Sequence, residues 1–228
     1  MKDISRTNEK RRKIPRALII AGVAVICLAL AAAGFFVGRK IAARIRGSSV
    51  ATDTDPGWNA PSYVAYEPLV VNEYSRPGTA LEKITAVVVH YVGNPGTTAE
   101  QNRSYFAGLA SSGATYASSH FLIGLEGEVI QNVPLDEIAY CSNNRNSDTV
   151  SIECCHPAED GKFTGATYSS LVTLLRDLCV EYGLDPKTDI IRHYDVTGKL
   201  CPLYFVEHED EWERLKDDVA RIMPSGTE

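Results

Sequence analysis

The sequence predicts an α/β fold in which one mixed central β-sheet is flanked by helices, in a single domain that follows one transmembrane helix. Short β-branched runs alternate along the chain with segments of helical periodicity, and that alternation is typical of a sheet with helices packed on it. The region that shows this pattern, residues 81–228, is long enough to bury one hydrophobic core. A long uncharged apolar run lies near the N-terminus.

The apolar run extends from Ala17 to Gly38, which is 22 residues without a charged side chain. A helix of that length, at about 1.5 Å per residue, crosses the hydrocarbon of a bilayer. Seven Lys and Arg residues precede the run and four follow it closely, so we expect residues 1–16 to form a cytoplasmic tail and the rest to lie outside the cell. A cleaved signal peptide is the alternative, because Ala31-Ala32-Ala33 resembles a cleavage site. The apolar run is, however, longer than the apolar segment of a usual signal peptide.

Residues 39–80 are expected to form an extracytoplasmic tether, because Gly, Pro and Asp interrupt them and no hydrophobic period is sustained. The charge of the chain is divided unevenly. Residues 1–46 carry 11 of the 23 basic and 2 of the 29 acidic side chains, which leaves 12 basic and 27 acidic side chains for residues 47–228. Nucleic-acid phosphates would repel a region with a net charge of −15, so the sequence argues against nucleic-acid binding.

The first half of the domain contains a strand, a helix and a hairpin. Residues 84–89 are rich in β-branched side chains, as in a strand that is buried on both faces. Residues 98–109 follow a helical pattern, with Thr98 placed to cap the N-terminus. Residues 120–125 and 128–132 are two further runs separated by a Glu-Gly pair, which predicts a hairpin.

The second half of the domain repeats the alternation. Residues 150–155 predict a strand, and leucines at helical spacing between residues 171 and 178 predict a helix that Gly183 ends. Residues 190–193 predict a short strand. Residues 207–223 predict a last helix, whose acidic first turns suit the positive end of the helix dipole.

Two histidines and one cysteine stand out as candidate metal ligands. His90 ends the first strand, His193 ends the last strand, and Cys201 follows after a short loop. Imidazole nitrogen and thiolate sulfur are ligands that zinc prefers. Three such ligands leave the fourth tetrahedral position open, as in a catalytic zinc site. The spacing is not that of a zinc finger, so the pattern alone leaves the metal site open.

Glu153 is the candidate for proton transfer. It lies in a strand that is otherwise mostly apolar, where a carboxylate is costly to bury unless the protein uses it. Strand alternation places Glu153 on the face opposite Ile152 and Cys154. There it could take a proton from an attacking water and pass it to a leaving amine. The alternative is a structural ion pair with Arg192 or Lys199.

The sequence resembles the type-2 N-acetylmuramoyl-L-alanine amidases, zinc amidases related to phage endolysins and to peptidoglycan recognition proteins, over residues 84–223. The resemblance rests on four segments in order: Val87-Val88-Val89-His90, Ser119-His120-Phe121, Ser151-Ile152-Glu153, and His193 through Lys199 to Cys201-Pro202. It implies that zinc is bound by His90, His193 and Cys201, and that the substrate is peptidoglycan. The bond implied is the amide between the lactyl group of N-acetylmuramic acid and L-alanine of the stem peptide.

The resemblance also implies roles for the other residues of these segments. Glu153 matches the acidic residue of the endolysin-like branch, and Lys199 would place a cation near the oxyanion of the tetrahedral intermediate. Short phage-lysozyme members have a catalytic tyrosine where this chain has Ser119, and this departure shifts proton transfer to Glu153. His120 is interpreted either as a substrate-contacting residue or as a hydrogen-bonded structural histidine.

Two other classes of protein remain as alternatives. Five cysteines lie outside the apolar run, an odd number, which indicates that at least one does not form a disulfide. A papain-like peptidase would use Cys154 or Cys155, but nucleophilic cysteines of that class lie at a helix start and this pair lies in a predicted strand. A non-catalytic wall-binding module would lack the zinc cysteine, whereas Cys201 is present.

Overall fold

The computed structural model describes residues 55–224 of the chain. The expected cytoplasmic tail and transmembrane helix, residues 1–38, lie outside this range. Among the helices that the structure describes, none has the length and apolarity needed to span a bilayer.

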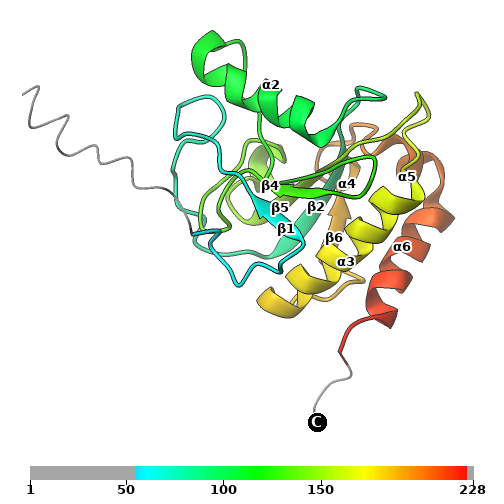
Figure 1. Ribbon diagram of the computed structural model, residues 1–228. Helices are drawn as coiled ribbons and strands as arrows, with labels where there is room; N and C mark the ends of the chain where they lie inside the picture. Colours follow the sequence, from blue (N-terminus) through cyan, green and yellow to red (C-terminus); the bar gives the residue numbers. More distant parts are fainter. Residues whose placement is uncertain (1–54, 225–228) are drawn as a thin grey trace, which may run out of the picture. The chain divides into compact units, whose positions relative to one another are not determined.

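A six-stranded mixed sheet forms the centre of the fold, in the order β1-β4-β3-β5-β2-β6 (Figure 1). Strands β3 and β4 pair antiparallel, and the other neighbouring pairs are parallel. The predicted mixed sheet and the predicted hairpin are therefore confirmed. The strand bounds are β1 Val64–Tyr66, β2 Ala86–Tyr91, β3 Phe121–Ile123, β4 Val129–Gln131, β5 Thr149–Cys154 and β6 Ile190–Arg192.

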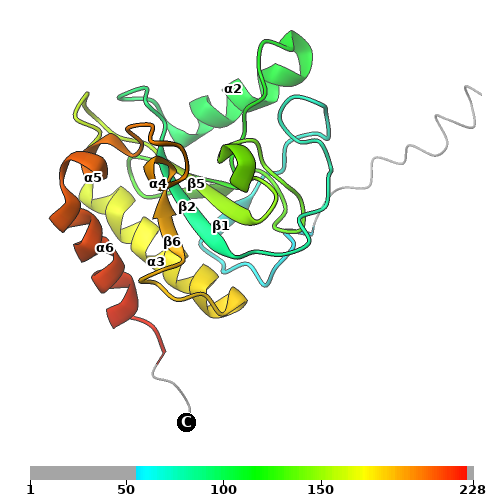
Figure 2. The same ribbon diagram turned by 180° about the vertical axis from the view of Figure 1, so that it is seen from behind.

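Helices cover both faces of the sheet, as Figures 1 and 2 show from opposite sides. Helix α2 (Ala99–Ser112) packs on one face, over the smaller of two apolar clusters. Helices α3 (Gly165–Tyr182) and α6 (Glu209–Arg221) pack on the other face, over the larger cluster. Three short helical segments complete the fold: the 3₁₀ helix η1 (Asn143–Arg145), α4 (His193–Thr197) and α5 (Leu203–Glu207).

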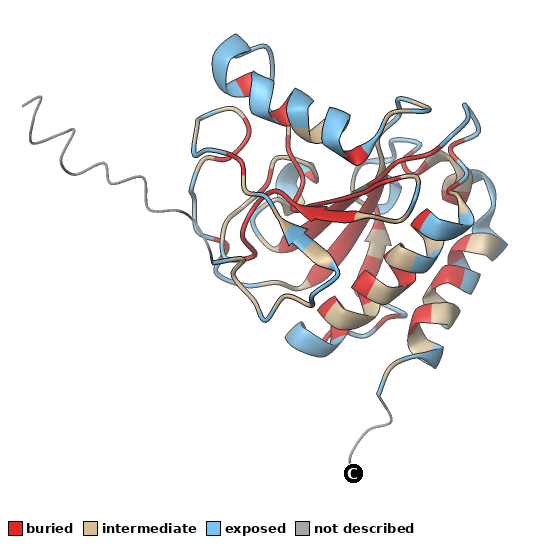
Figure 3. Cartoon of the chain, in the orientation of Figure 1, coloured by how far each residue is buried: buried red, intermediate tan, exposed pale blue. Residues whose placement is uncertain are grey.

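The central strands are buried on both faces, as their composition predicts (Figure 3). Val87 and Val89 of β2 belong to the larger apolar cluster, together with Val150 and Ile152 of β5. Apart from Tyr91 and Glu153, which are partly buried, every residue of these two strands is buried. A polar side chain on them must therefore find a partner or a function.

The helix boundaries follow local sequence signals. Thr98 caps α2 in a reciprocal capping box with Gln101, so the predicted N-terminus is confirmed. The helix continues three residues beyond the predicted end and stops at Gly113, which has a positive φ of 58°. Gly183 ends α3 in the same conformation. The predicted last helix is confirmed as α6, which begins two residues later than predicted, because residue 207 belongs to α5 and His208 separates the two helices.

The described part of the expected tether, residues 55–80, is packed onto the domain, which corrects that expectation. Strand β1 pairs with β4, and Leu69 is buried. Arg76 binds Glu137 through Nε and Nη2, each at 2.7 Å from a carboxylate oxygen. Because the segment packs through a three-residue strand and isolated side chains, it has no periodic pattern to detect.

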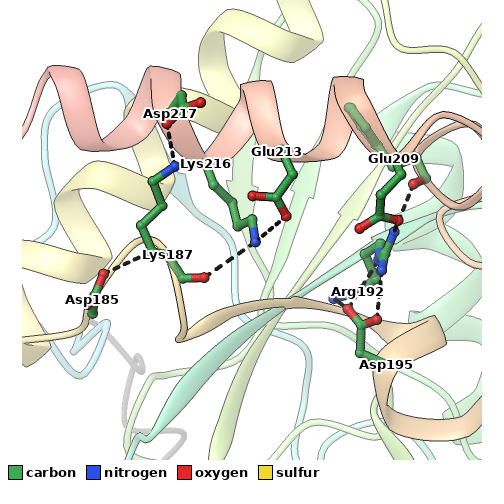
Figure 4. A network of polar contacts seen from close by, with 9 residues as sticks. Asp185, Lys187, Arg192, Asp195, Glu209, Glu213, Lys216 and Asp217 are labelled. Atoms are coloured by element: carbon green, nitrogen blue, oxygen red, sulfur yellow. Dashed lines mark hydrogen bonds and ion pairs between the residues drawn. The ribbon is translucent and has the colours of Figure 1, made fainter.

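A polar network fixes the end of β6 to α6 (Figure 4). The guanidinium of Arg192 binds the carboxylates of Asp195 and Glu209, and it also donates to the main-chain oxygen of Phe205. Lys187, in the turn before the same strand, pairs with Asp217 of α6. The strand end that precedes His193 is therefore held in place by side chains rather than by the sheet alone.

Candidate metal centre and active site

The carboxyl ends of three neighbouring parallel strands bring the candidate residues together. His90 of β2 lies directly opposite Glu153 of β5. On the other side of β2, Val89 lies opposite Arg192, so His193 emerges one step further along β6. Parallel strands place these positions at the same edge of the sheet, although they are far apart in sequence.

The three predicted ligands form one buried cluster. The ring centroids of His90 and His193 are 4.6 Å apart, and Cys201 Sγ lies 3.8 Å from Nδ1 of His90. One donor atom from each residue lies within 4.8 Å of the others. The main-chain N–H of Tyr194 donates to the oxygen of Cys201, and this bond brings the loop after α4 back to the strand end.

The electrostatics of the cluster suit a soft divalent cation. Burial lowers the pKa of His90 well below its ordinary value, with smaller contributions from His193 and Lys199, and burial also lowers the pKa of His193. Both imidazoles are therefore neutral and can donate a lone pair. Burial raises the pKa of the Cys201 thiol to about 12, so a thiolate there needs a cation beside it. Two neutral nitrogens and one sulfur fit zinc.

Glu153 lies beside this cluster with an unused acceptor. Its Oε1 accepts a hydrogen bond from the thiol of Cys141 at 3.6 Å. Its Oε2 is buried and has no hydrogen-bond partner within residues 55–224. Burial raises the pKa of Glu153 to about 8. The alternative of an ion pair with Arg192 is not observed, because that guanidinium binds Asp195 and Glu209.

Two adjoining cavities open over the cluster and form a single groove. One, of about 440 Å³, is lined by the three candidate ligands, and the other, of about 480 Å³, extends along α2. The second cavity is lined by the amide side chains of Asn94, Gln101 and Asn102. The residues that line both cavities are Val92, Phe106, Ala117, Glu153 and Lys199.

Lys199 lies on the exposed loop between α4 and α5. It lines both cavities, and its positive charge lowers the pKa of His90, of His193 and of Glu153. No ion pair joins it to Glu153 in the described part of the chain. The structure thus places Lys199 with the predicted site residues, at the solvent-facing side of the groove.

His120 is not part of the groove. Its ring is buried, Nδ1 accepts from the main-chain N–H of Ser151 at 3.0 Å, and Nε2 lies 2.9 Å from the main-chain oxygen of Glu137. Both nitrogens are therefore engaged inside the fold, and burial lowers the pKa of His120 to about 4. Of the two roles that the sequence left open, this geometry supports the structural one.

The adjacent cysteines lack the surroundings of a nucleophile. Cys154 belongs to the larger apolar cluster, and burial raises its thiol pKa well above the ordinary value. Cys155 is buried beside Asn102, at 3.6 Å from its Nδ2, and burial raises its pKa to about 12. No histidine hydrogen-bonds to either sulfur in the described residues. This arrangement argues against a cysteine peptidase.

Three residues of the site were not predicted from the sequence. Cys141, Ser142 and Asn143 are consecutive, and their side chains contact Glu153, His90 and His193 respectively. They lie on a loop without a strand or helix pattern. The only signal that could have pointed to them is a polar run that immediately precedes the strand of Glu153.

Comparison with known proteins supports the same interpretation. Residues 80–203 match the family described as N-acetylmuramoyl-L-alanine amidase. The chain is 34% identical over 173 residues to the N-acetylmuramoyl-L-alanine amidase BlyA of Bacillus subtilis (strain 168), which covers 67% of this chain and 46% of BlyA. It is 32% identical over 170 residues to CwlL of Bacillus licheniformis, which covers 69% of this chain and 46% of CwlL. The chain therefore spans about half the length of these relatives.

Solved structures share the fold. A mutant endolysin from Bacillus subtilis superposes with a TM-score of 0.58 at 24% identity, over 68% of this chain and 97% of the endolysin. PlyL superposes with a TM-score of 0.59 at 20% identity, over 68% of this chain and 96% of PlyL. The match to the amidase family over residues 80–203 confirms the resemblance seen in the sequence, and the chain belongs to the type-2 N-acetylmuramoyl-L-alanine amidase family.

Proposed function

We propose that this chain is a zinc-dependent N-acetylmuramoyl-L-alanine amidase that hydrolyses the lactyl–L-alanine amide of bacterial peptidoglycan. The observation that carries the proposal is the convergence of His90, His193 and Cys201 at the wall of a groove that also holds the unpartnered Oε2 of Glu153. Membership of the amidase family gives the class of bond.

Zinc would be held by the two neutral imidazoles and the thiolate of Cys201. When bound, it would supply Lewis-acid chemistry that polarises the scissile carbonyl. The side chains of His90, His193 and Cys201 are buried, so little water would compete with zinc for their donor atoms. The open side of the cluster is the groove, so a substrate carbonyl can approach it there.

Glu153 would carry the proton through the reaction. Its Oε2 accepts a proton from the attacking water, and the resulting carboxylic acid donates that proton to the nitrogen of the leaving L-alanine. A pKa of about 8 suits both halves of this exchange near neutral pH, since neither form of the carboxyl is strongly disfavoured. Lys199, at the rim of the groove, would stabilise the negative charge that develops on the carbonyl oxygen.

We also propose that the domain acts outside the cell, anchored by the helix expected over residues 17–38. The excess of basic residues before the apolar run supports this orientation. Protease added to cells stripped of their wall should remove the domain and leave a fragment that contains residues 1–46. A domain that is cleaved only after lysis would contradict the orientation.

Metal analysis of the purified full chain, combined with mass spectrometry of digested peptidoglycan, tests the enzymatic proposal. We expect about one zinc per chain. The expected products are glycan strands with a free lactyl carboxylate and stem peptides with a free L-alanine amino group. The Cys201→Ser variant should lose most of the zinc and the activity, because a hydroxyl is a far poorer ligand than a thiolate.

The Cys154→Ala/Cys155→Ala double variant is the matched control, since it removes two buried thiols outside the groove. It should retain zinc and lytic activity, and a chelator should abolish that activity. A folded double variant that is inactive, with a chelator-resistant wild type, would favour the cysteine-peptidase alternative. Zinc binding without any amide cleavage would favour a wall-binding module. Full zinc content in both Cys201→Ser and His193→Ala would refute the metal site.

A further inference from the structure

We propose that Ser142 and Asn143 are positioning residues of the metal centre. They hold the two ligand histidines in the tautomer that is protonated at Nε2, which leaves the lone pair of Nδ1 in each ring available to the metal. This inference rests on the proposed zinc function and concerns residues outside the predicted ligand set. The element that carries them is the loop of residues 141–146, which includes η1. It is referred to below as the positioning loop.

The positioning loop contacts three site residues with three consecutive side chains. Ser142 Oγ lies 3.2 Å from Nε2 of His90, and Asn143 Oδ1 lies 2.8 Å from Nε2 of His193. The preceding residue, Cys141, donates its thiol to Glu153. A loop about 50 residues from either histidine in sequence thus contacts every group that the proposed reaction uses at the strand ends.

The chemistry of these contacts determines where the imidazole protons lie. The side-chain oxygen of Asn143 can only accept, so Nε2 of His193 must carry the hydrogen and Nδ1 keeps its lone pair. For His90, Nδ1 is the nitrogen that faces Cys201 Sγ, at 3.8 Å. Its Nε2–H is then free to donate to Ser142 Oγ. Such a bond to the second ring nitrogen orients a metal-binding histidine and raises its basicity.

The backbone of the loop indicates that these contacts have a function. Asn143 has a φ of 55° and is the one non-glycine residue with positive φ between residues 55 and 224. Glycine adopts this conformation without strain, whereas a side chain there carries a cost. Asn146 holds the conformation, because its Oδ1 accepts from the main-chain N–H groups of Cys141 and Ser142, at 3.1 and 2.6 Å. The strain is explained if the amide of Asn143 is needed at His193.

Three substitutions separate this role from simple loop stability. Asn143→Gly relieves the backbone strain and removes the amide, and Ser142→Ala removes the acceptor at His90. Asn143→Asp keeps an acceptor oxygen and tolerates the same backbone conformation. Asn144→Gly is the matched control, because Asn144 is the next residue, is exposed, and makes no side-chain hydrogen bond within the described range.

The experiment is a competition titration of the metal-free full chain with Zn²⁺ against a chromophoric chelator. We expect Asn143→Gly and Ser142→Ala each to weaken zinc affinity by about 10–100-fold, the usual effect of losing such a partner. Asn143→Asp and Asn144→Gly should bind zinc like the wild type or more tightly. Melting curves of the metal-free variants should show that Asn143→Gly is as stable as the wild type.

Nitrogen chemical shifts of the histidine rings give a second readout that needs no metal. In the metal-free wild type, His193 should be protonated at Nε2, and Asn143→Gly should yield a mixture of tautomers. Unchanged zinc affinity and an unchanged tautomer in folded Asn143→Gly would overturn the inference. A wild-type chain that binds no zinc would instead overturn the proposed function, and the ring shifts would still decide whether the loop sets the tautomers.

Discussion

Replacing Glu153 with Gln tests the assignment of the general base most directly. The amide has nearly the size of the carboxyl and leaves His90, His193 and Cys201 in place, so zinc content should stay close to that of the wild type. It cannot take up a proton, so kcat should fall by about 10²–10⁴-fold, the usual contribution of a positioned acid–base group. The loss should appear mainly in kcat, because the proton moves only on the way to the transition state.

The same substitution should lower the rate but raise the stability of the fold, and the size of the gain in stability follows from the burial of Glu153. Burial raises the pKa of Glu153 from 4.5 to about 8. Below pH 4.5 the carboxyl is protonated in both the folded and the unfolded state, so it imposes no penalty. Between pH 4.5 and 8 only the unfolded state ionises freely, so the folded state loses about 1.4 kcal/mol for each pH unit, up to about 5 kcal/mol, and the penalty stays constant above that range. Partial exposure screens this penalty, and we expect about 2 kcal/mol.

Metal-free Glu153→Gln should therefore be more stable than the metal-free wild type at pH 8 and equally stable at pH 4. Urea unfolding at both pH values, together with steady-state kinetics of the zinc-loaded chain on purified peptidoglycan, gives the measurements. Glu153→Ala is less suitable as a comparison because it leaves a cavity. A variant that unfolds at lower urea concentration at pH 8 yet turns over at the wild-type rate would show that Glu153 is a structural ion-pair partner.

Two further predictions concern groups outside the groove. The pKa of His120 is lowered to about 4, so the unfolding free energy of the wild type should fall by about 3 kcal/mol as the pH drops from 6.5 to 4, and urea unfolding of His120→Ala should show a weaker dependence over that range. A pH dependence that is identical in the two proteins would refute the assignment of a neutral buried histidine. Glu137→Gln leaves the buried guanidinium of Arg76 without its carboxylate and should lower the unfolding free energy by about 3 kcal/mol. Loss of less than about 0.5 kcal/mol in thermal or urea unfolding would show that this pair does not hold residues 55–80 to the domain.

The meeting of the candidate metal ligands His90 and His193 was predictable because the fold repeats a simple geometry. Each histidine follows a β-branched run, and the carboxyl ends of neighbouring parallel strands must meet at one edge of the sheet. Glu153 was predictable for the same reason, because strand alternation turns it away from the apolar cluster that contains Ile152. In these cases local pattern and sheet topology together place the side chain.

The parts that the sequence did not predict depend on contacts without a local pattern. Residues 55–80 pack through single side chains: Leu69 joins an apolar cluster with residues of α2, and Arg76 binds Glu137, 61 residues further along the chain. The positioning loop depends on one residue with positive φ and on an amide that accepts two main-chain bonds. Such features are specified by tertiary contacts, and neither hydrophobic periodicity nor propensity reports them.

Burial has one consistent effect on the groups at the strand ends, and that effect explains why they suit a metal. It favours the uncharged form of every group: neutral His90, protonated Cys201 and protonated Glu153. A divalent cation would reverse this preference for the thiol, because a thiolate next to a cation in a site of low dielectric is strongly stabilised. The same burial keeps the imidazoles free of competing protons. The core encloses the strands and leaves polar residues at their ends. That placement keeps the histidines neutral, where the positioning loop orients them, and it raises the pKa of Glu153 to about 8.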